Sequence, residues 1–194
     1  MRQAKIKRKT AETNVRLKLS IDGNGRADID TGIGFFDHML GQLAFHSGMD
    51  LKIRAKGDLH IDAHHTVEDV GLSLGKAFKK ALDNKKGIAR YGYAYAPMDE
   101  ALTRVAIDIS NRPHLSFQVP FNNARLGKQM ETELFAEFFK SFAQKAGISL
   151  HIDTLRGGND HHKVESAFKA TALALRMATA KTGRKSLPST KNAL

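Results

Sequence analysis

One short motif occurs twice in this chain, and its second copy determines how the sequence divides. His-His-Thr-Val-Glu at 64–68 returns 97 residues later as His-His-Lys-Val-Glu at 161–165. The neighbouring apolar pattern repeats as well, because segment 49–55 matches segment 148–154 at an offset of 99. The chain is therefore predicted to contain two copies of one half-domain.

Each half shows the same order of predicted elements: about three strands, a helix, a strand and a second helix. Alternating apolar and polar residues indicate the strands, and apolar residues three or four apart indicate the helices. The turn-forming residues at 22–25 are typical of a hairpin, so segment 26–30 is expected to return as the partner of strand 13–21. The predicted strands are 5–10, 13–21, 26–30, 49–55, 91–96, 101–110, 114–119 and 148–154, and the predicted helices are 34–48, 64–83, 131–146 and 161–182.

These elements predict an α+β fold made by internal duplication of a two-layer half-domain. Each half would have an antiparallel or mixed sheet with two helices on one side, and the halves would be related by a pseudo-twofold axis. We expect one catalytic domain over 1–194, with repeats at about 1–86 and 87–183 and a tail at 184–194. The sequence leaves open whether the halves meet through sheets or through helices.

The doubled histidines suggest a metal site. A single His-x-x-x-Glu is commonly an exposed helical pair, but two matching copies favour a shared chemical role. Adjacent histidines diverge by about 100° around a helix, so each pair is expected to serve two centres, with His65 near Glu68. Asp62 and Asn159 precede the two motifs and are expected N-cap residues.

The chain has no cysteine, so any metal must be held by imidazole and carboxylate. The repeat also aligns His38 with Glu137, each on the first predicted helix of its half. Ligands without sulfur suit octahedral Mn, with Fe, Co and Zn as competitors. The candidate ligands are His38, His64, His65, Glu68, Glu137, His161, His162 and Glu165.

The formal charge of +11 raises the possibility of a nucleic-acid partner. The basic residues are spread along the chain, however, and no motif of a nucleic-acid reader is present. A small phosphorylated ligand would use the same charge, held by groups such as Arg90, Arg112, Lys169 and the hydroxyl and basic residues of 189–191. No secretory signal or run of about 18 apolar residues is present, so we expect a cytoplasmic protein that does not enter a membrane.

Two other sequence features are less specific indicators of function. Glu12 and Glu100 occupy matching positions at strand starts, and one of them is a candidate acid/base. Gly71 to Ala77 resembles a phosphate-binding Walker A loop, but it has one residue too few between its glycines and ends in alanine.

Several segments together resemble the imidazoleglycerol-phosphate dehydratase family. Besides the two His-His motifs, they are Thr-Gly-Ile-Gly-Phe-Phe-Asp-His-Met-Leu (31–40), Pro-Met-Asp-Glu-Ala-Leu (97–102), Arg-Pro-His-Leu (112–115) and Pro-Ser-Thr-Lys (188–191). The resemblance covers nearly the whole chain, in order. Many relatives have histidine where this chain has Glu137, and tyrosine where it has His114.

The resemblance implies dehydration of imidazole glycerol phosphate to imidazole acetol phosphate, through an imidazolate bound to two Mn²⁺ ions per active site. It also implies a shell of two dozen identical chains with sites at their interfaces. Glu12 would be the acid/base. The implied metal ligands are those candidates other than Glu137, whose own ligation is an open question. The implied substrate-binding residues are Gln42, Arg90, Arg112, Lys169, Ser189 and Lys191.

Two alternative functions remain at this point. The charge would suit a non-enzymatic RNA-associated protein, although that gives no reason for the paired His-His motifs. A binuclear hydrolase of phosphate esters would use similar ligands but needs a metal-bound hydroxide as nucleophile. Metal analysis and an assay for the ketone product distinguish the three.

Overall fold

The two halves fold alike, with one four-stranded sheet each. The computed structural model describes residues 2–191. The first half contains β1 (Gln3–Lys9), β2 (Thr13–Ser20), β3 (Ala27–Asp30), α1 (Gly34–Ser47), β4 (Asp50–Gly57) and α2 (His64–Leu82). The second half contains β5 (Tyr91–Met98), β6 (Ala101–Asp108), β7 (His114–Gln118), β8 (Arg125–Leu126), β9 (Met130–Glu131), α3 (Glu133–Ala146), β10 (Ser149–Arg156) and α4 (Asp160–Thr179).

The sheet topology confirms the predicted α+β duplication. The strand orders are β1-β2-β4-β3 and β5-β6-β10-β7, which are the same order in the two repeats. In each sheet three strands are antiparallel, and the last strand, β3 or β7, runs parallel to its neighbour. The short hairpin of β8 and β9 is an insertion of the second half that the sequence pattern did not predict.

The predicted hairpin between strands 13–21 and 26–30 was wrong. β4 lies between β2 and β3, so β2 pairs with β4, and β3 pairs with β4 in parallel. The turn residues form part of a loop that Asp50 holds. Its carboxylate accepts hydrogen bonds from the backbone N–H groups of Asn24 (2.8 Å) and Arg26 (3.0 Å). This loop is therefore bound to the start of β4 instead of closing a hairpin.

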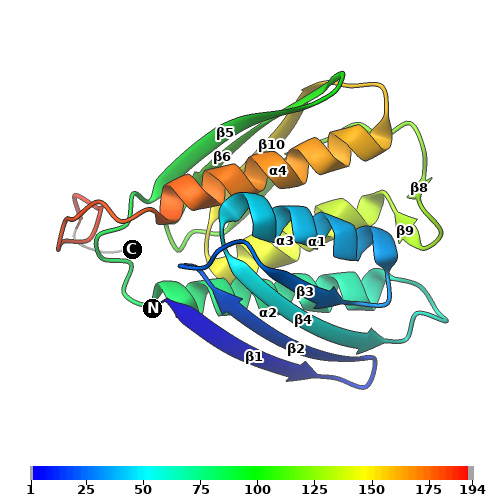
Figure 1. Cartoon of the computed structure of the whole chain (residues 1–194), viewed down its shortest axis with the longest axis horizontal. Coiled ribbons are helices and arrows are strands. Elements are labelled where there is room, and N and C mark those ends of the chain that lie inside the picture. Colours follow the sequence, from blue (N-terminus) through cyan, green and yellow to red (C-terminus); the bar gives the residue numbers. More distant parts are fainter. Residues whose placement is uncertain (1, 192–194) are drawn as a thin grey trace.

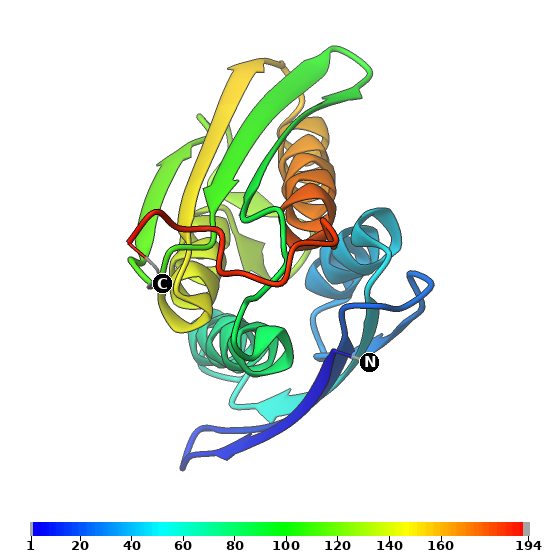
Figure 2. The ribbon, with the colours of Figure 1, turned by 90° about the vertical axis from the view of Figure 1, so that its left-hand side faces the viewer.

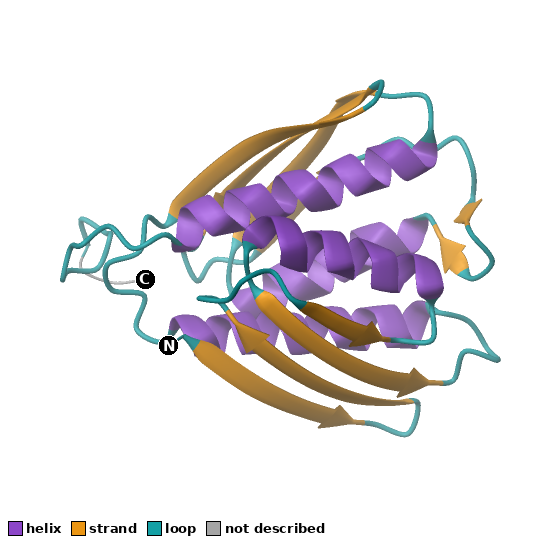
Figure 3. Cartoon of the chain, viewed as in Figure 1, coloured by secondary structure: helices purple, strands orange, loops and turns teal. Residues whose placement is uncertain are grey.

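The halves meet through their helices, which answers the question that the sequence left open. The two sheets form the outer layers and the four helices lie between them (Figures 1 and 3). Helix α1 packs against α4, and α2 packs against α3, so each contact joins the two repeats. The view in Figure 2 shows the same sheet–helix–sheet arrangement end on. None of the described helices is both long and apolar enough to cross a membrane.

Phenylalanine side chains fill the space between the helices. The ring of Phe138 on α3 lies 5.2 Å from that of Phe36 on α1 and 5.5 Å from that of Phe168 on α4. All three are fully buried. Each such side chain removes a large apolar area from water, which is the main favourable contribution to folding. The four helices all begin at the same end of the molecule, near β8 and β9 (Figure 1).

Gly71 and Gly75 allow α2 to approach α3 closely. A methyl group on Gly75 would lie 2.5 Å from the carbonyl oxygen of Phe142 and 2.8 Å from the nitrogen of Ala146. A methyl group on Gly71 would lie 2.8 Å from the carbonyl oxygen of Phe138. The Walker-like pattern of the sequence is thus explained by helix packing.

Replacing Gly75 with alanine is expected to destabilise the protein. The two helices must move apart to accept the methyl group, and such overpacking costs about 1–3 kcal/mol. Gly41→Ala on α1 is the matched control, because its methyl group would meet no atom within 4 Å. In a helix that change should stabilise by about 0.5–1 kcal/mol. Thermal unfolding at one protein concentration measures the stability of both variants. Equal unfolding midpoints for the two variants would contradict the packing argument.

Candidate metal centre

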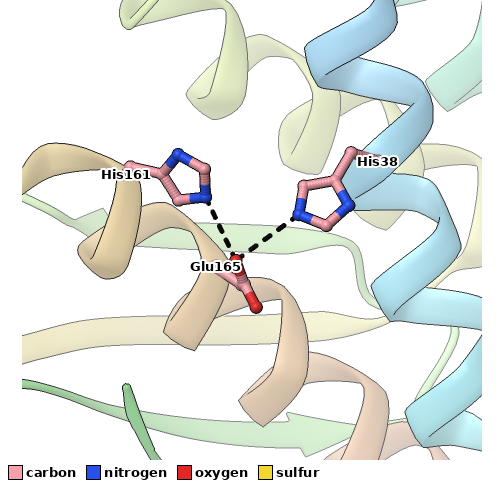
Figure 4. A group of neighbouring side chains, drawn as sticks. All are labelled: His38, His161 and Glu165. Carbon is pink, nitrogen blue, oxygen red and sulfur yellow. Dashed lines mark hydrogen bonds and ion pairs between the residues drawn. The ribbon is translucent and has the colours of Figure 1, made fainter. Parts of the chain in front are cut away.

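Three predicted ligands gather at the start of α4. His38 projects from α1, and His161 and Glu165 project from α4, one turn apart (Figure 4). Oxygen Oε2 of Glu165 lies 3.2 Å from Nε2 of His161 and 3.5 Å from Nε2 of His38. The three donor atoms lie within 4.8 Å of one another. The His-His helix of one half therefore receives its further ligand from the first helix of the other half.

This donor set fits a divalent metal ion. With metal–donor bonds of about 2.1 Å, adjacent donors in an octahedron stand about 3 Å apart, close to the separations at Glu165. Two imidazoles and a carboxylate are suitable ligands for Mn, Fe, Co or Zn. The side chain of Glu165 is only 7% exposed, whereas those of His38 and His161 are 47% and 43% exposed. The three-ligand group is thus buried on the side of Glu165 and open to solvent on the side of the two histidines.

Lys169 keeps Glu165 ionised. Its Nζ lies 2.6 Å from Oε1, the oxygen of Glu165 that does not face the two histidines. Burial alone would favour the neutral acid, but the hydrogen bond from Lys169 and the nearby imidazoles outweigh it and lower the pKa of Glu165 below its usual value. A carboxylate that stays charged when partly buried is a better metal ligand than a neutral acid.

The equivalent residues of the other helix pair are arranged differently. The repeat matches His38, His161 and Glu165 with Glu137, His64 and Glu68, which lie on α3 and α2. Within residues 2–191 only the first set satisfies the distances of a three-ligand group.

The contacts of Glu137 account for part of this difference. The carboxylate of Glu137 contacts Nζ of Lys140 at 3.0 Å and Oγ of Ser141 at 3.3 Å, both on its own helix. His64, whose ring is 6.1 Å from that of His65, is exposed, and Glu68 is partly exposed. In this conformation Glu137 is thus paired with a lysine instead of facing a histidine.

Adjacent histidines face different partners, as the helical geometry predicts. His161 faces Glu165, but Nδ1 of His162 donates to Glu100 at 2.7 Å. Nδ1 of His65 likewise donates to Asp58 at 3.0 Å. The carboxylate partner raises the pKa of His162 and that of His65.

One of the two predicted N-caps is present. The Asn159 side chain accepts from the backbone N–H groups of His161 (2.9 Å) and His162 (3.4 Å). The N-cap of α2 is Ala63 and not Asp62, because the chain turns into the helix one residue later. Asp62 nevertheless accepts a hydrogen bond from the backbone N–H of His64 at 2.8 Å.

Glu12 and Glu100 have different surroundings despite their matching positions. Glu100 accepts hydrogen bonds from the backbone N–H groups of Gly158 (3.1 Å) and Asn159 (2.8 Å) as well as from His162. These bonds lower its pKa to about 2, the one from Asn159 most of all. Glu12 is exposed on the β1–β2 turn, and its charge contributes, after Asp58, to the raised pKa of His65. Of the two, Glu12 is the one whose carboxylate makes no hydrogen bond within residues 2–191.

His46, which was not among the predicted site residues, lies close to two of them. Its Nε2 donates to the side-chain oxygen of Gln42 at 3.1 Å, one turn earlier on α1. Burial, and then the charge of Lys169, lower the pKa of His46, which places it near that lysine. Gln42, His46 and Lys169 thus lie beside the three-ligand group. The sequence feature that could have indicated this pair is the four-residue spacing of Gln42 and His46, which puts both on one helix face.

The remaining predicted substrate-binding residues lie at the opposite end of α4. Arg90 pairs with Asp108 (2.7 Å), which Arg112 also approaches (3.7 Å). Nη1 of Arg90 donates to the carbonyl oxygen of Pro188 at 2.9 Å, so the tail lies against this arginine. Further along the same tail, the backbone N–H of Lys191 donates to Oγ of Ser189 at 3.3 Å.

The two groups of predicted site residues are far apart within one chain. The backbone N–H of Arg90 donates to the carbonyl oxygen of Ala178 at the end of α4, whereas His161 is at the beginning. At about 1.5 Å per residue, the helix separates them by about 25 Å. An imidazole ring with a three-carbon phosphate chain is much shorter than this, so one chain cannot bring both groups to the same small molecule.

Comparison with known sequences identifies relatives along the whole chain. The family model described as imidazoleglycerol-phosphate dehydratase matches residues 31–175. A protein of that name from Methylibium petroleiphilum is 55% identical over 195 residues, covering 100% of this chain and 98% of the relative. Another from Thiobacillus denitrificans is 55% identical over 196 residues, covering 100% of both.

Solved structures agree with the sequence comparison. A crystal structure of imidazoleglycerol-phosphate dehydratase from Staphylococcus aureus is 40% identical, with a TM-score of 0.84, and the match covers 93% of this chain and 99% of that one. A structure from Pyrococcus furiosus is 36% identical, with a TM-score of 0.83, and covers 97% of this chain and 100% of that one. Fold and sequence therefore point to the same relatives.

Proposed function

This chain belongs to the imidazoleglycerol-phosphate dehydratase family, hydro-lyases of histidine biosynthesis, and we propose that it dehydrates its substrate at a site with two metal ions. The substrate is imidazole glycerol phosphate and the product is imidazole acetol phosphate. The observation that supports a metal-dependent reaction is the three-ligand group of His38, His161 and Glu165, and the second ion is proposed from the repeated His-His motif. Its neighbours Lys169 and Gln42 add a charge and an amide suited to a phosphate.

His38, His161 and Glu165 would hold one ion, with Mn²⁺ preferred. His64, His65, Glu68 and His162 would provide the second set, with Glu137 as a further candidate after release from Lys140. When bound, the two ions would supply Lewis-acid chemistry to the imidazole ring of the substrate, which favours loss of the neighbouring hydroxyl. The exposed side of the histidines leaves room for that ring.

The protein side chains would perform the remaining steps. Glu12 would remove the proton from the carbon next to the one that loses the hydroxyl, giving an enol that becomes the ketone. Lys169 and Gln42 would bind the phosphate beside the ring site, which fixes the direction of the substrate along α4. Removing the proton only after the hydroxyl has left avoids a strongly basic carbanion, so an ordinary carboxylate can act as the base.

The active site is proposed to form between neighbouring copies of the chain. The separation of about 25 Å along α4 supports this, because Arg90, Arg112, Ser189 and Lys191 can reach a substrate at His161 only from another copy. A closed shell of two dozen identical chains would let every copy contribute both ends. Ions held between copies would couple assembly to metal binding.

Metal removal tests this proposal. The purified chain with Mn²⁺ is expected to form the ketone from imidazole glycerol phosphate, to lose this activity with a chelator, and to recover it when Mn²⁺ is restored. Light scattering should show smaller assemblies after chelation. Release of inorganic phosphate without ketone would instead indicate a phosphate-ester hydrolase. Salt-sensitive RNA binding with no turnover would support the RNA-associated alternative.

A further inference from the structure

Asp69 is a buried carboxylate that the proposed chemistry does not use. It follows Glu68 on α2, and its side chain is 6% exposed. One oxygen accepts from Nε of Arg8 on β1 at 2.7 Å, and the other accepts from the hydroxyl of Thr13 at the start of β2. A buried charge requires such partners, because unpaired burial is costly. Asp69 therefore ties helix α2 to both strands that flank the β1–β2 turn.

The same network continues to the backbone of Glu12. Oγ1 of Thr13 lies 3.3 Å from Oγ1 of Thr10. That Thr10 oxygen accepts from the backbone N–H groups of Glu12 (3.2 Å) and Thr13 (3.0 Å). Thr10 N–H in turn donates to the carbonyl oxygen of Thr13 at 2.9 Å, which closes the turn. The connection from Asp69 to Glu12 is thus continuous through two hydroxyl groups.

The second repeat has no equivalent of this network. The positions that match Arg8, Thr13 and Asp69 are Ala96, Ala101 and Ser166. Oγ of Ser166 bonds only neutral groups, the hydroxyl of Thr103 (2.7 Å) and a backbone carbonyl. In that half Glu100 is held through its own carboxylate instead. A fixed turn with a free carboxylate is found only in the half that has Glu12.

We propose that Asp69 is a positioning residue, which holds the Glu12 turn against α2 through Thr13 while leaving the Glu12 carboxylate free. This inference rests on the proposed role of Glu12 in proton transfer. Fixing the turn through the backbone lets Glu12 stay near His65 without an ion pair that would block its oxygens. Rigid placement matters because a misplacement of about 1 Å can lower a rate about a hundredfold.

Thr13→Val tests the connection with the smallest change in shape. The variant removes the hydroxyl and is expected to lower kcat by roughly ten- to a hundredfold, with KM and Mn content unchanged. Thr13→Ser restores the hydroxyl and should stay within about threefold of the parent. Asp69→Asn provides a second variant and should also lower kcat. Ser166→Ala is the matched control in the other repeat, with kcat expected to be unchanged.

A double-mutant cycle separates positioning from a general loss of structure. If Thr13 acts through Glu12, Thr13→Val should cause no further loss of kcat when combined with Glu12→Gln. A full additional loss in that combination would overturn the inference, as would normal kcat in both Thr13→Val and Asp69→Asn. If Glu12→Gln itself remains active, the proposed role of Glu12 fails instead, so the two failures can be told apart.

Discussion

Replacing Glu12 with glutamine is expected to lower kcat by roughly 10²- to 10⁴-fold, the usual contribution of a general acid or base. The amide keeps the size of the side chain but cannot accept the substrate proton. Among the described residues no hydrogen bond or ion pair joins the Glu12 side chain to a proposed metal ligand or to Lys169, so metal content and substrate affinity should be nearly unchanged. Steady-state kinetics, metal analysis and calorimetric substrate binding measure the three quantities.

Glu100→Gln is the matched control for this change. Glu100 occupies the equivalent position, but its carboxylate holds the loop before α4 through Gly158, Asn159 and His162. Its replacement should lower the unfolding temperature and weaken Mn²⁺ binding through His162, so the two variants are compared at saturating Mn²⁺, where kcat should fall much less than in Glu12→Gln. Loss of metal or of substrate binding in Glu12→Gln would contradict the acid/base role.

The second large effect is expected at Glu165. Replacing it with glutamine removes the anionic ligand between two histidines and the negative charge with which Lys169 pairs at 2.6 Å. Loss of outer groups around a metal typically costs 10- to 100-fold in affinity, so loss of a ligand should cost more than about a hundredfold. Titration of metal-free protein with Mn²⁺ measures this, and turnover should fall with metal occupancy.

Two further variants sharpen the interpretation of the Glu165 result. Glu133→Gln changes an exposed acid in the first turn of α3, so its metal affinity should match that of the parent. Glu137→Gln asks whether the glutamate that matches His38 in the repeat is a ligand. Lower Mn²⁺ affinity in Glu137→Gln alone, with normal affinity in Glu165→Gln, would refute the assignment of the centre.

Much of the fold could be predicted because the repeat allowed each half to support the other. Strand β2 and its counterpart β6 share one alternating pattern, and the helices α2 and α4 share the His-His motif. The hairpin error arose because turn residues at 22–25 describe local backbone geometry only. Whether a turn closes a hairpin or admits a third strand depends on distant pairing, here by β4.

The candidate site was harder to predict because it joins different repeats. Spacing placed His161 and Glu165 on one helix face, but only the packing of α1 against α4 brings His38 to them. The link from Asp69 to Thr13 spans 56 residues of sequence, and no periodic pattern reports such a contact. Likewise, the role of Gly71 and Gly75 became clear only from the backbone atoms of α3 opposite them.

The length of α4 has a genetic consequence. A chain with Glu165→Gln keeps the Arg90 end intact, and a chain with a damaged Arg90 keeps the histidine end intact. If copies share their sites, two such alleles, each inactive alone, would restore part of the histidine prototrophy when expressed together in one cell. An active site contained within a single chain would not permit this complementation.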